Sequence, residues 1–364
     1  MQMKCNYRST RTVVAPRQME SFRARRGYTI IELLTVTAVI SMLIALLFPA
    51  LQSARSSARR VQCLNNMRNV SLGLLQATDS ANRFPACGYY GDGTPGTVGS
   101  FRSWVVDILP YIDQASLYNE WDFDEHYLKT TNGPLGDKHI AVLICPDDIS
   151  EVPGQGNLTY VVNSGVGFSA LIGGVHDCPI GPLSGKLDLN GNGITCNSST
   201  KGDGTPSDRE LFFQMGLFFN ETWKGTIRAQ RHHTMASITD GTSNTLLISE
   251  NIRTGYNPQD PLSNWASPNP YLTSFYIGTP CKGGNCAAGN VDYNLANSGE
   301  SAINAGIKKS EGHSPFPSSL HQGGVHAGFC DGHIQFLSEK IDGKVYASMA
   351  SPQGQALENT LLAQ

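Results

Sequence analysis

The feature that most constrains this chain is an apolar run of 24 residues from Tyr28 to Leu51, which contains one charged side chain, Glu32. A helix of that length spans about 36 Å, whereas the hydrocarbon core of a bilayer is roughly 30 Å thick. The run is longer than the apolar part of a secretory signal peptide, about 7–15 residues, and no Ala-x-Ala cleavage site follows it. It therefore predicts a retained transmembrane helix over 28–51.

Charge is distributed unevenly around this run. Residues 1–27 hold seven of the 27 basic side chains and one of the 30 acidic ones, so the remaining chain has 20 bases against 29 acids, a net charge of −9. A basic segment before an apolar helix is typical of a segment that stays on the cytoplasmic side. The alternative for 1–27 is a basic arm that binds nucleic acid. The overall net charge of −3 excludes a protein whose whole surface binds nucleic acid, and we expect no nucleic-acid partner.

Two residues are unusual in a membrane helix. Glu32 is costly to place in lipid, so it needs either a proton or a cation from a neighbouring subunit, such as a free N-terminal amine. Pro49 removes one helical hydrogen bond and should loosen the helix near its outer end. The cost of placing Glu32 in lipid indicates that this residue has a function beyond anchoring.

These residues resemble a known signal. The letters RRGYTIIELL at 25–34 resemble the prepilin cleavage and methylation signal of type IV pilins and type II secretion pseudopilins. The resemblance implies that a prepilin peptidase cuts after Gly27 and that the new N-terminal residue, Tyr28, is N-methylated, although Phe is usual there. It also implies that Glu32 pairs with the terminal amine of an adjacent subunit, and that Pro49 is the proline at which pilin helices soften.

The helix is expected to continue beyond the membrane as an amphipathic stalk over 52–78. Apolar residues recur there at three- or four-residue steps, which predicts one face that packs on the following domain. The stripe consists of Val61, Leu64, Met67, Val70 and Leu74, and the basic residues Arg55, Arg59, Arg60 and Arg68 lie mostly off it, on a face expected to be solvated.

Residues 79–364 are expected to form an extracytoplasmic head with little helix. Its 38 glycines and 19 prolines, counted over the whole chain, favour long loops. The patterns predict a short helix in 101–118 broken at Pro110, strands at 140–144, 158–162, 211–220 and 245–249, and a hairpin in 325–336 around Asp331-Gly332. The predicted fold class is α+β, with a long N-terminal helix packed on a mainly antiparallel β head.

A second resemblance covers residues 25–340. Four motifs support it: RRVQCLNN at 59–66, LICPDD at 143–148, ITDGTSNT at 238–245, and His321 followed after nine residues by Asp331-Gly332. Together they resemble a large planctomycete family of pilin-like proteins with an uncharacterised periplasmic head, the DUF1559 group. The resemblance implies a membrane-anchored, pilin-type α+β protein, and it makes His321, Asp331 and Gly332 markers of the fold.

Eight of the nine cysteines follow the basic leader, and an even number outside the cytoplasm is consistent with disulfides. Eight cysteines allow 105 pairings. The favoured local pairs are Cys178–Cys196 and Cys281–Cys286, since each brackets a glycine-rich loop. Zinc is the alternative, but no Cys-x2-Cys pair is present.

A candidate calcium loop begins at Asp188. Asp188, Asn190 and Asn192 place oxygen ligands at alternate positions before Gly193, as in the first half of an EF-hand loop. The twelfth position is Ser199 instead of Glu, so an Asn-Gly turn held by side-chain hydrogen bonds is the competing interpretation.

The histidines do not predict an enzyme. They gather in the C-terminal half, but a hydrolytic triad of Ser243, His321 and Asp331 lacks the G-x-S-x-G context of a nucleophile. Instead, we expect Asp331 to form its turn and His321 to form local hydrogen bonds.

The sequence thus favours a non-enzymatic, pilin-like subunit. It would sit in the inner membrane with its N-terminus in the cytoplasm and its head in the periplasm or at the cell surface. Its expected partners are the prepilin peptidase and methyltransferase, other pilin-like subunits and membrane lipid. The alternative is a monomeric, membrane-tethered module that binds glycans or calcium, which exposed tryptophans at positions 121, 223 and 265 would favour.

Overall fold

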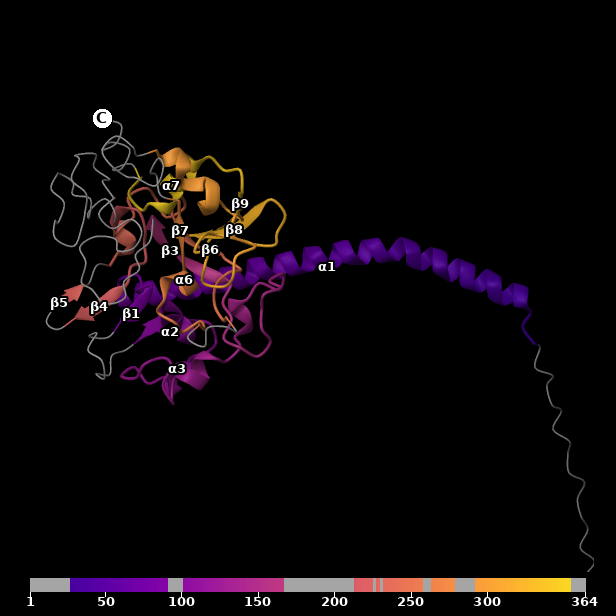
Figure 1. Ribbon diagram of the computed structural model, residues 1–364, viewed down its shortest axis with the longest axis horizontal. Helices are drawn as coiled ribbons and strands as arrows, with labels where there is room; N and C mark the ends of the chain where they lie inside the picture. Colours follow the sequence, from indigo (N-terminus) through magenta and orange to yellow (C-terminus); the bar gives the residue numbers. More distant parts are fainter. Residues whose placement is uncertain are drawn as a thin grey trace, which may run out of the picture. The chain divides into compact units, whose positions relative to one another are not determined.

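The computed structural model describes residues 27–90, 101–166, 213–224, 227–229, 232–257, 263–278 and 292–354. The chain divides into two compact units, Met1–Arg55 and Ser56–Gln364. Helix α1 (Ile30–Ala81) begins in the first unit and ends in the second (Figure 1).

The first unit contains the apolar part of α1. Its large side chains are exposed, for example Ile30 at 77% and Phe48 at 62%. The helix is long and apolar enough to cross a membrane, a criterion that a signal sequence near the N-terminus also meets. Helical structure continues through Pro49, so the proline does not end the helix.

In the second unit, one face of the last part of α1 is buried. Cys63, Met67, Val70 and Leu74 are buried there, while Val61 is 56% exposed. The predicted stripe is therefore confirmed except at its start. Residues two apart on a helix lie about 200° apart, so burying Cys63 turns Val61 outward.

Helix α1 ends at Ala81, three residues beyond the predicted stalk. Asn82 adopts a left-handed conformation with φ +51°, and the Arg83 N–H donates to the Thr78 carbonyl over 3.0 Å. Asparagine tolerates this conformation better than most residues, so it can stop a helix.

The larger sheet has five strands in the order β7-β3-β6-β8-β9. All neighbouring pairs are antiparallel except β3 with β7. The strands are β3 (Tyr160–Val166), β6 (Leu246–Glu250), β7 (Ser274–Ile277), β8 (Gly324–Phe329) and β9 (Ile334–Ser338).

Both faces of this sheet are covered. Tyr160 and Val162 of β3 lie in one core with Met67 of α1, whereas Val161 lies in a second core with Tyr346 of α7 (Gly343–Ala350). Since successive strand side chains point to opposite faces, α1 and α7 cover opposite sides of the sheet.

The smaller sheet has the order β2-β1-β4-β5, with β1 and β4 parallel and the other two pairs antiparallel. Its strands are β1 (Gly88–Tyr90), β2 (Arg102–Ser103), β4 (Glu221–Lys224) and β5 (Ile227–Ala229).

The short helices of the head are α2 (Trp104–Ile108), η1 (Leu109–Tyr111), α3 (Ala115–Glu120), α4 (Gly133–Gly136), η2 (Ala141–Leu143), η3 (Met235–Ser237), α6 (Pro270–Thr273), η5 (Tyr293–Asn297) and η6 (Gly299–Ser301).

Most predicted elements of the head are confirmed, and two strands are wrong. The helix in 101–118 ends as α2 just before Pro110 enters η1, and the hairpin forms around Asp331-Gly332. The run 140–144 instead forms η2, and the described part of 211–220 precedes β4 without strand pairing. The architecture is α+β, a long N-terminal helix packed on a mainly antiparallel β head with long loops.

Candidate functional site

The predicted processing signal lies just before α1. Nothing lies within 4 Å of the position that a side chain at Gly27 would take, and Tyr28 is 89% exposed. The Thr29 N–H and hydroxyl donate to Glu32 Oε2 over 2.8 and 3.0 Å, and the Glu32 N–H donates to the Thr29 hydroxyl over 3.2 Å. This reciprocal arrangement is a capping box, so Glu32 has a partner within its own helix.

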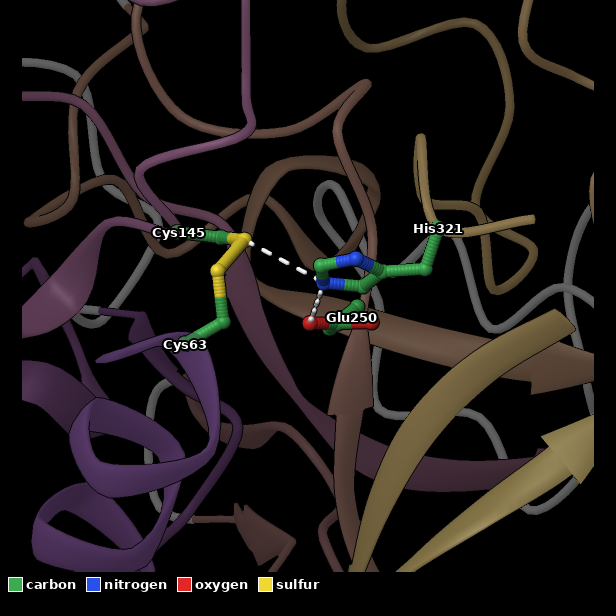
Figure 2. A group of neighbouring side chains, drawn as sticks. All are labelled: Cys63, Cys145, Glu250 and His321. Atoms are coloured by element: carbon green, nitrogen blue, oxygen red, sulfur yellow. Dashed lines mark hydrogen bonds and ion pairs between the residues drawn. A yellow bond between two sulfur atoms is a disulfide. The ribbon is translucent and has the colours of Figure 1, made fainter. Parts of the chain in front are cut away.

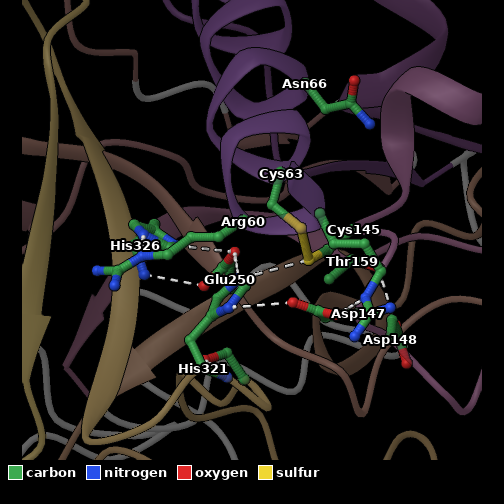
Figure 3. The surroundings of a disulfide bond; sticks show 12 residues. Arg60, Cys63, Asn66, Cys145, Asp147, Asp148, Thr159, Glu250, His321 and His326 are labelled. Carbon is green, nitrogen blue, oxygen red and sulfur yellow. Dashed lines mark hydrogen bonds and ion pairs between the residues drawn. A yellow bond between two sulfur atoms is a disulfide. The ribbon is translucent and has the colours of Figure 1, made fainter. Parts of the chain in front are cut away.

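A second site lies in the head, where a disulfide joins α1 to the loop after η2. Cys63 is fully buried and Cys145 is 2% exposed. One turn further along α1, the Asn66 amide donates to the carbonyls of Ala141 over 3.2 Å and Ile144 over 2.9 Å. The helix therefore holds this loop by the disulfide, which Figure 3 shows, and by hydrogen bonds from Asn66.

Glu250, at the end of β6, is fully buried beside the disulfide (Figure 2). Its Oε2 accepts from the His326 N–H over 2.8 Å. Its Oε1 lies 3.2 Å from His321 Nε2 and 3.3 Å from His326 Nδ1. Burial raises the pKa of Glu250, but the hydrogen bonds from His321 and His326 oppose it, and the pKa lies below its usual value.

His321, the predicted family-motif histidine, links three groups of the site. Its Nε2 lies 3.6 Å from Cys145 Sγ as well as close to Glu250. Its Nδ1 lies 3.5 Å from Asp147 Oδ2. The two ring nitrogens thus face carboxylates that come from different segments, which fixes the orientation of the ring.

His326 connects the site to α1 through an arginine. Arg60 Nε donates to His326 Nε2 over 3.3 Å, and its guanidinium lies 4.9 Å from the ring centre of Phe336. Because Nε2 accepts this bond, the ring proton is assigned to Nδ1, where it faces Glu250. Arg59 pairs with Asp147. Both arginines are exposed, as expected for a solvated face, but their charged ends reach the site.

The loop that carries Cys145 is fixed by a second carboxylate. Asp148 accepts from the Thr159 hydroxyl over 2.8 Å, and from the Ser150 N–H and hydroxyl over 2.9 and 2.6 Å. Burial raises the pKa of Asp148, and these hydrogen bonds oppose the increase. Asp148 therefore holds its own loop against β3.

The residues of the His-x9-Asp-Gly motif do not act together. Asp331 accepts from the His333 N–H over 3.0 Å and lies 2.6 Å from His333 Nδ1 at the hairpin turn. Gly332 has φ +87°, which this tight turn requires. The Ser243 side chain hydrogen-bonds to Asp331 at this turn. The His321 ring instead contacts Cys145, Asp147 and Glu250, so the two halves of the motif belong to different structures and the described contacts do not join Ser243 and Asp331 to His321 in a triad.

Several predicted site residues lie outside the described residues. They are the candidate calcium ligands Asp188, Asn190 and Asn192, and the favoured disulfide partners Cys178, Cys196, Cys281 and Cys286. Cys63–Cys145 was not among the favoured pairs, although both cysteines lie in the motifs at 59–66 and 143–148.

The ligand-type atoms of Cys63, Cys145, Glu250 and His321 lie within 4.8 Å of one another. In the disulfide form the two sulfurs are not thiolates, and thiolates are the form in which cysteine binds metals. In this oxidation state the cluster therefore joins four segments: α1, the loop after η2, β6 and the segment before β8.

A separate polar groove of about 550 Å³ runs beside α1. Its lining includes the helix residues Gln62, Asn66, Asn69 and Gln76 and the segments 111–114 and 140–142. Of the tryptophans whose exposure would favour a binding module, Trp121 is 5% exposed and Trp265 is fully buried, so both belong to the core. The Trp223 side chain lies outside the description.

The curated proteins and the solved structures give no match to the chain. A family profile described as "Protein of unknown function (DUF1559)" matches residues 52–344. The match covers the head, the disulfide with its buried acid and histidines, and the hairpin turn. The chain belongs to the DUF1559 family.

Proposed function

We propose that this chain is a membrane-anchored, pilin-like subunit of a type II secretion or type IV pilus-like assembly. A prepilin peptidase cuts it after Gly27, a methyltransferase modifies Tyr28, and the helix over 28–51 keeps it in the inner membrane with the head outside the cytoplasm. The observation that carries the proposal is the Arg-Arg-Gly-Tyr-Thr signal with Glu32 at the start of an apolar helix.

The capping box supports the role of Glu32 in assembly. The Thr29 donors bind Oε2, and Oε1 accepts neither of these bonds. A carboxylate can accept several hydrogen bonds, so a terminal amine from another subunit can bind while the cap persists. In lipid each charged group is costly without a partner, which favours pairing between subunits.

Processing is tested by mass spectrometry of the protein isolated from its native membrane. The expected mature chain starts at methylated Tyr28, and a Gly27→Leu chain keeps its leader because the peptidase can no longer approach the backbone. A control change at an exposed position of the head, Ile149→Leu, is cut normally. A mature chain that starts elsewhere, or normal cutting of Gly27→Leu, contradicts the proposal.

Assembly is tested separately. Glu32→Ala should insert in the membrane and be cut, yet crosslinks between neighbouring membrane helices should fall at least tenfold. Thr37→Ala, which removes a hydroxyl bonded to Leu34 within the same helix, should leave them unchanged. Unchanged crosslinks in Glu32→Ala would refute the pairing role.

The second candidate is a monomeric, membrane-tethered binding module for a glycan or for calcium. The amide-lined groove beside α1 is the observation that favours it, because amides both donate and accept hydrogen bonds. Crosslinking separates the two functions, since a tethered monomer gives no ordered oligomers through its membrane helix. Binding of neutral oligosaccharides that Asn69→Leu abolishes would support the module.

A further inference from the structure

The disulfide cluster has the geometry of a metal site whose two sulfur ligands are locked together. We propose that reduction of Cys63–Cys145 converts the cluster into a tetrahedral site for a thiophilic divalent cation, with Zn²⁺ as the type. The ligands are the two thiolates, His321 Nε2 and Glu250 Oε1 (Figure 2). This inference does not depend on membrane assembly.

The distances between the prospective ligand atoms fit such a site. With Zn–S of about 2.3 Å and Zn–N and Zn–O of about 2.0–2.1 Å, tetrahedral geometry places S and N about 3.5 Å apart, and N and O about 3.4 Å apart. In the head, Cys145 Sγ lies 3.6 Å from His321 Nε2, and His321 Nε2 lies 3.2 Å from Glu250 Oε1. All four ligand-type atoms lie within 4.8 Å of one another, so small side-chain movements complete the site once the bond between the two sulfurs is broken.

The outer contacts of the cluster also suit a metal. A histidine that binds zinc almost always donates its other ring N–H to a carboxylate, a carbonyl or a water. His321 Nδ1 already faces Asp147 Oδ2 at 3.5 Å, which leaves Nε2 toward the sulfurs. The Glu250 carboxylate is oriented through its other oxygen by the His326 N–H at 2.8 Å.

The charge and the burial of the ligands also favour a divalent cation such as Zn²⁺. Two thiolates and one carboxylate bring three negative charges into a buried place, and a divalent cation leaves a net charge of −1. Arg59 and Arg60 of α1 lie next to the acids and histidines and offset the remaining charge. The mixed sulfur and nitrogen ligand set selects zinc over calcium or magnesium, which require oxygen ligands.

The conversion balances with a dithiol as the reductant. A thiolate of the dithiol attacks one sulfur of the disulfide, which breaks the Cys63–Cys145 bond and forms a mixed disulfide. The second thiol of the reductant then attacks the mixed disulfide and releases the cysteine that was bound in it as a thiolate. Two electrons have then passed to the head, and the reductant has become a disulfide. The metal takes the place of two protons, which are released.

The test uses the full chain in detergent, reduced with a phosphine under anaerobic conditions, and Co²⁺ as a spectroscopic probe. We expect one Co²⁺ per chain with tetrahedral d–d bands and a thiolate-to-cobalt charge-transfer band, both displaced by Zn²⁺. The oxidised chain should show neither band. Absence of these bands in the reduced chain, or loss of its far-UV circular dichroism despite the metal, overturns the proposal.

Variants identify the ligands. Cys63→Ser, Cys145→Ser and His321→Ala should each weaken Co²⁺ binding at least tenfold, whereas Cys87→Ser and Cys330→Ser, which change the buried free cysteines, should not. Asp147→Asn should keep the same spectrum and lose about 10–100-fold in affinity, as expected for an orienting partner.

The other cysteines of the head are excluded with one further chain. A chain with serine at 178, 196, 281 and 286 should keep the signal. If the signal follows those cysteines or survives His321→Ala, the site is elsewhere and the proposal is wrong.

Discussion

Glu32 and Glu250 are both acids in apolar surroundings, and they are stabilised in opposite ways. The protein donors to Glu32 come from Thr29, three residues away on the same helix. Glu250 is bound by His321 and His326, the latter 76 residues along the chain, inside a fold that the Cys63–Cys145 bond closes.

The difference concerns what each acid can do. A carboxylate whose hydrogen-bond donors lie within one turn of its own helix keeps those donors in any environment of the helix. Its second oxygen therefore remains available to a donor from another molecule. An acid that joins segments distant in sequence cannot leave them without opening the head. Glu32 is therefore suited to assembly, and Glu250 to holding α1, β6 and β8 together.

The largest expected effect follows from removing the buried acid. Glu250→Gln leaves two buried histidines without their carboxylate, so the free energy of unfolding of the head should fall by about 3–5 kcal/mol. Chemical denaturation of the purified chain measures it. Glu300→Gln, which breaks a pair between Lys309 and an exposed acid, should leave the free energy of unfolding nearly unchanged. If the two variants are equally stable, the buried network does not hold the head together.

A third acid, Glu311, has its pKa shifted in the opposite direction to that of Glu250. Burial raises the pKa of Glu311 to about 7, although the Arg253 guanidinium 3.0 Å away opposes this. The folded head then binds a proton between pH 4.5 and 7 that the unfolded chain does not. Its stability should therefore rise as pH falls through this window, by up to about 3 kcal/mol. Denaturation midpoints measured from pH 7.5 to 4.5 check it, and Glu311→Gln should flatten the curve. A wild-type curve that is already flat contradicts the prediction.

For Glu250 we expect the opposite dependence of stability on pH, at lower pH. Its lowered pKa contributes stability that is complete above about pH 4.5, the ordinary value, and is lost as pH falls through the folded-state pKa. Each unit of lowering corresponds to about 1.4 kcal/mol. The difference in unfolding free energy between the wild type and Glu250→Gln should therefore shrink below pH 4.5. A constant difference down to pH 3 would show that Glu250 does not titrate there.

The sequence was sufficient where the determinants are local. The hairpin formed because Asp331 and Gly332 supply the turn within a few residues of two alternating runs. Helix α1 was predicted from its apolar run over 28–51 and from the three- or four-residue periodicity of the stalk that follows. The signal around Gly27 is likewise contiguous, although its processing stays a prediction.

The sequence failed where distant groups compete for the backbone. The run 140–144 has the composition of a strand, but Asn66 occupies the carbonyls of Ala141 and Ile144. The run 211–220 fails similarly, because the N–H groups of Leu217 and Phe218 both donate to the Asn163 carbonyl. Disulfide pairing failed for the same reason, since 82 residues separate Cys63 from Cys145 and no local spacing links them.

The smallest expected effect tests the other side of the comparison. Thr29→Ala removes one bond to Glu32 and the bond that the hydroxyl accepts from the Glu32 N–H, and loss of such a cap costs about 1 kcal/mol. Amide exchange at Glu32, measured by hydrogen–deuterium exchange of the full chain in detergent, should therefore accelerate about fivefold. Thr29→Ser keeps the hydroxyl and should exchange as the wild type does. Because the Thr29 N–H still donates to Glu32 in the alanine chain, the carboxylate stays oriented, and intersubunit crosslinks should persist. Crosslinks lost in Thr29→Ala but retained in Thr29→Ser would show instead that the hydroxyl is required for assembly, and that the acid is not independent of its cap.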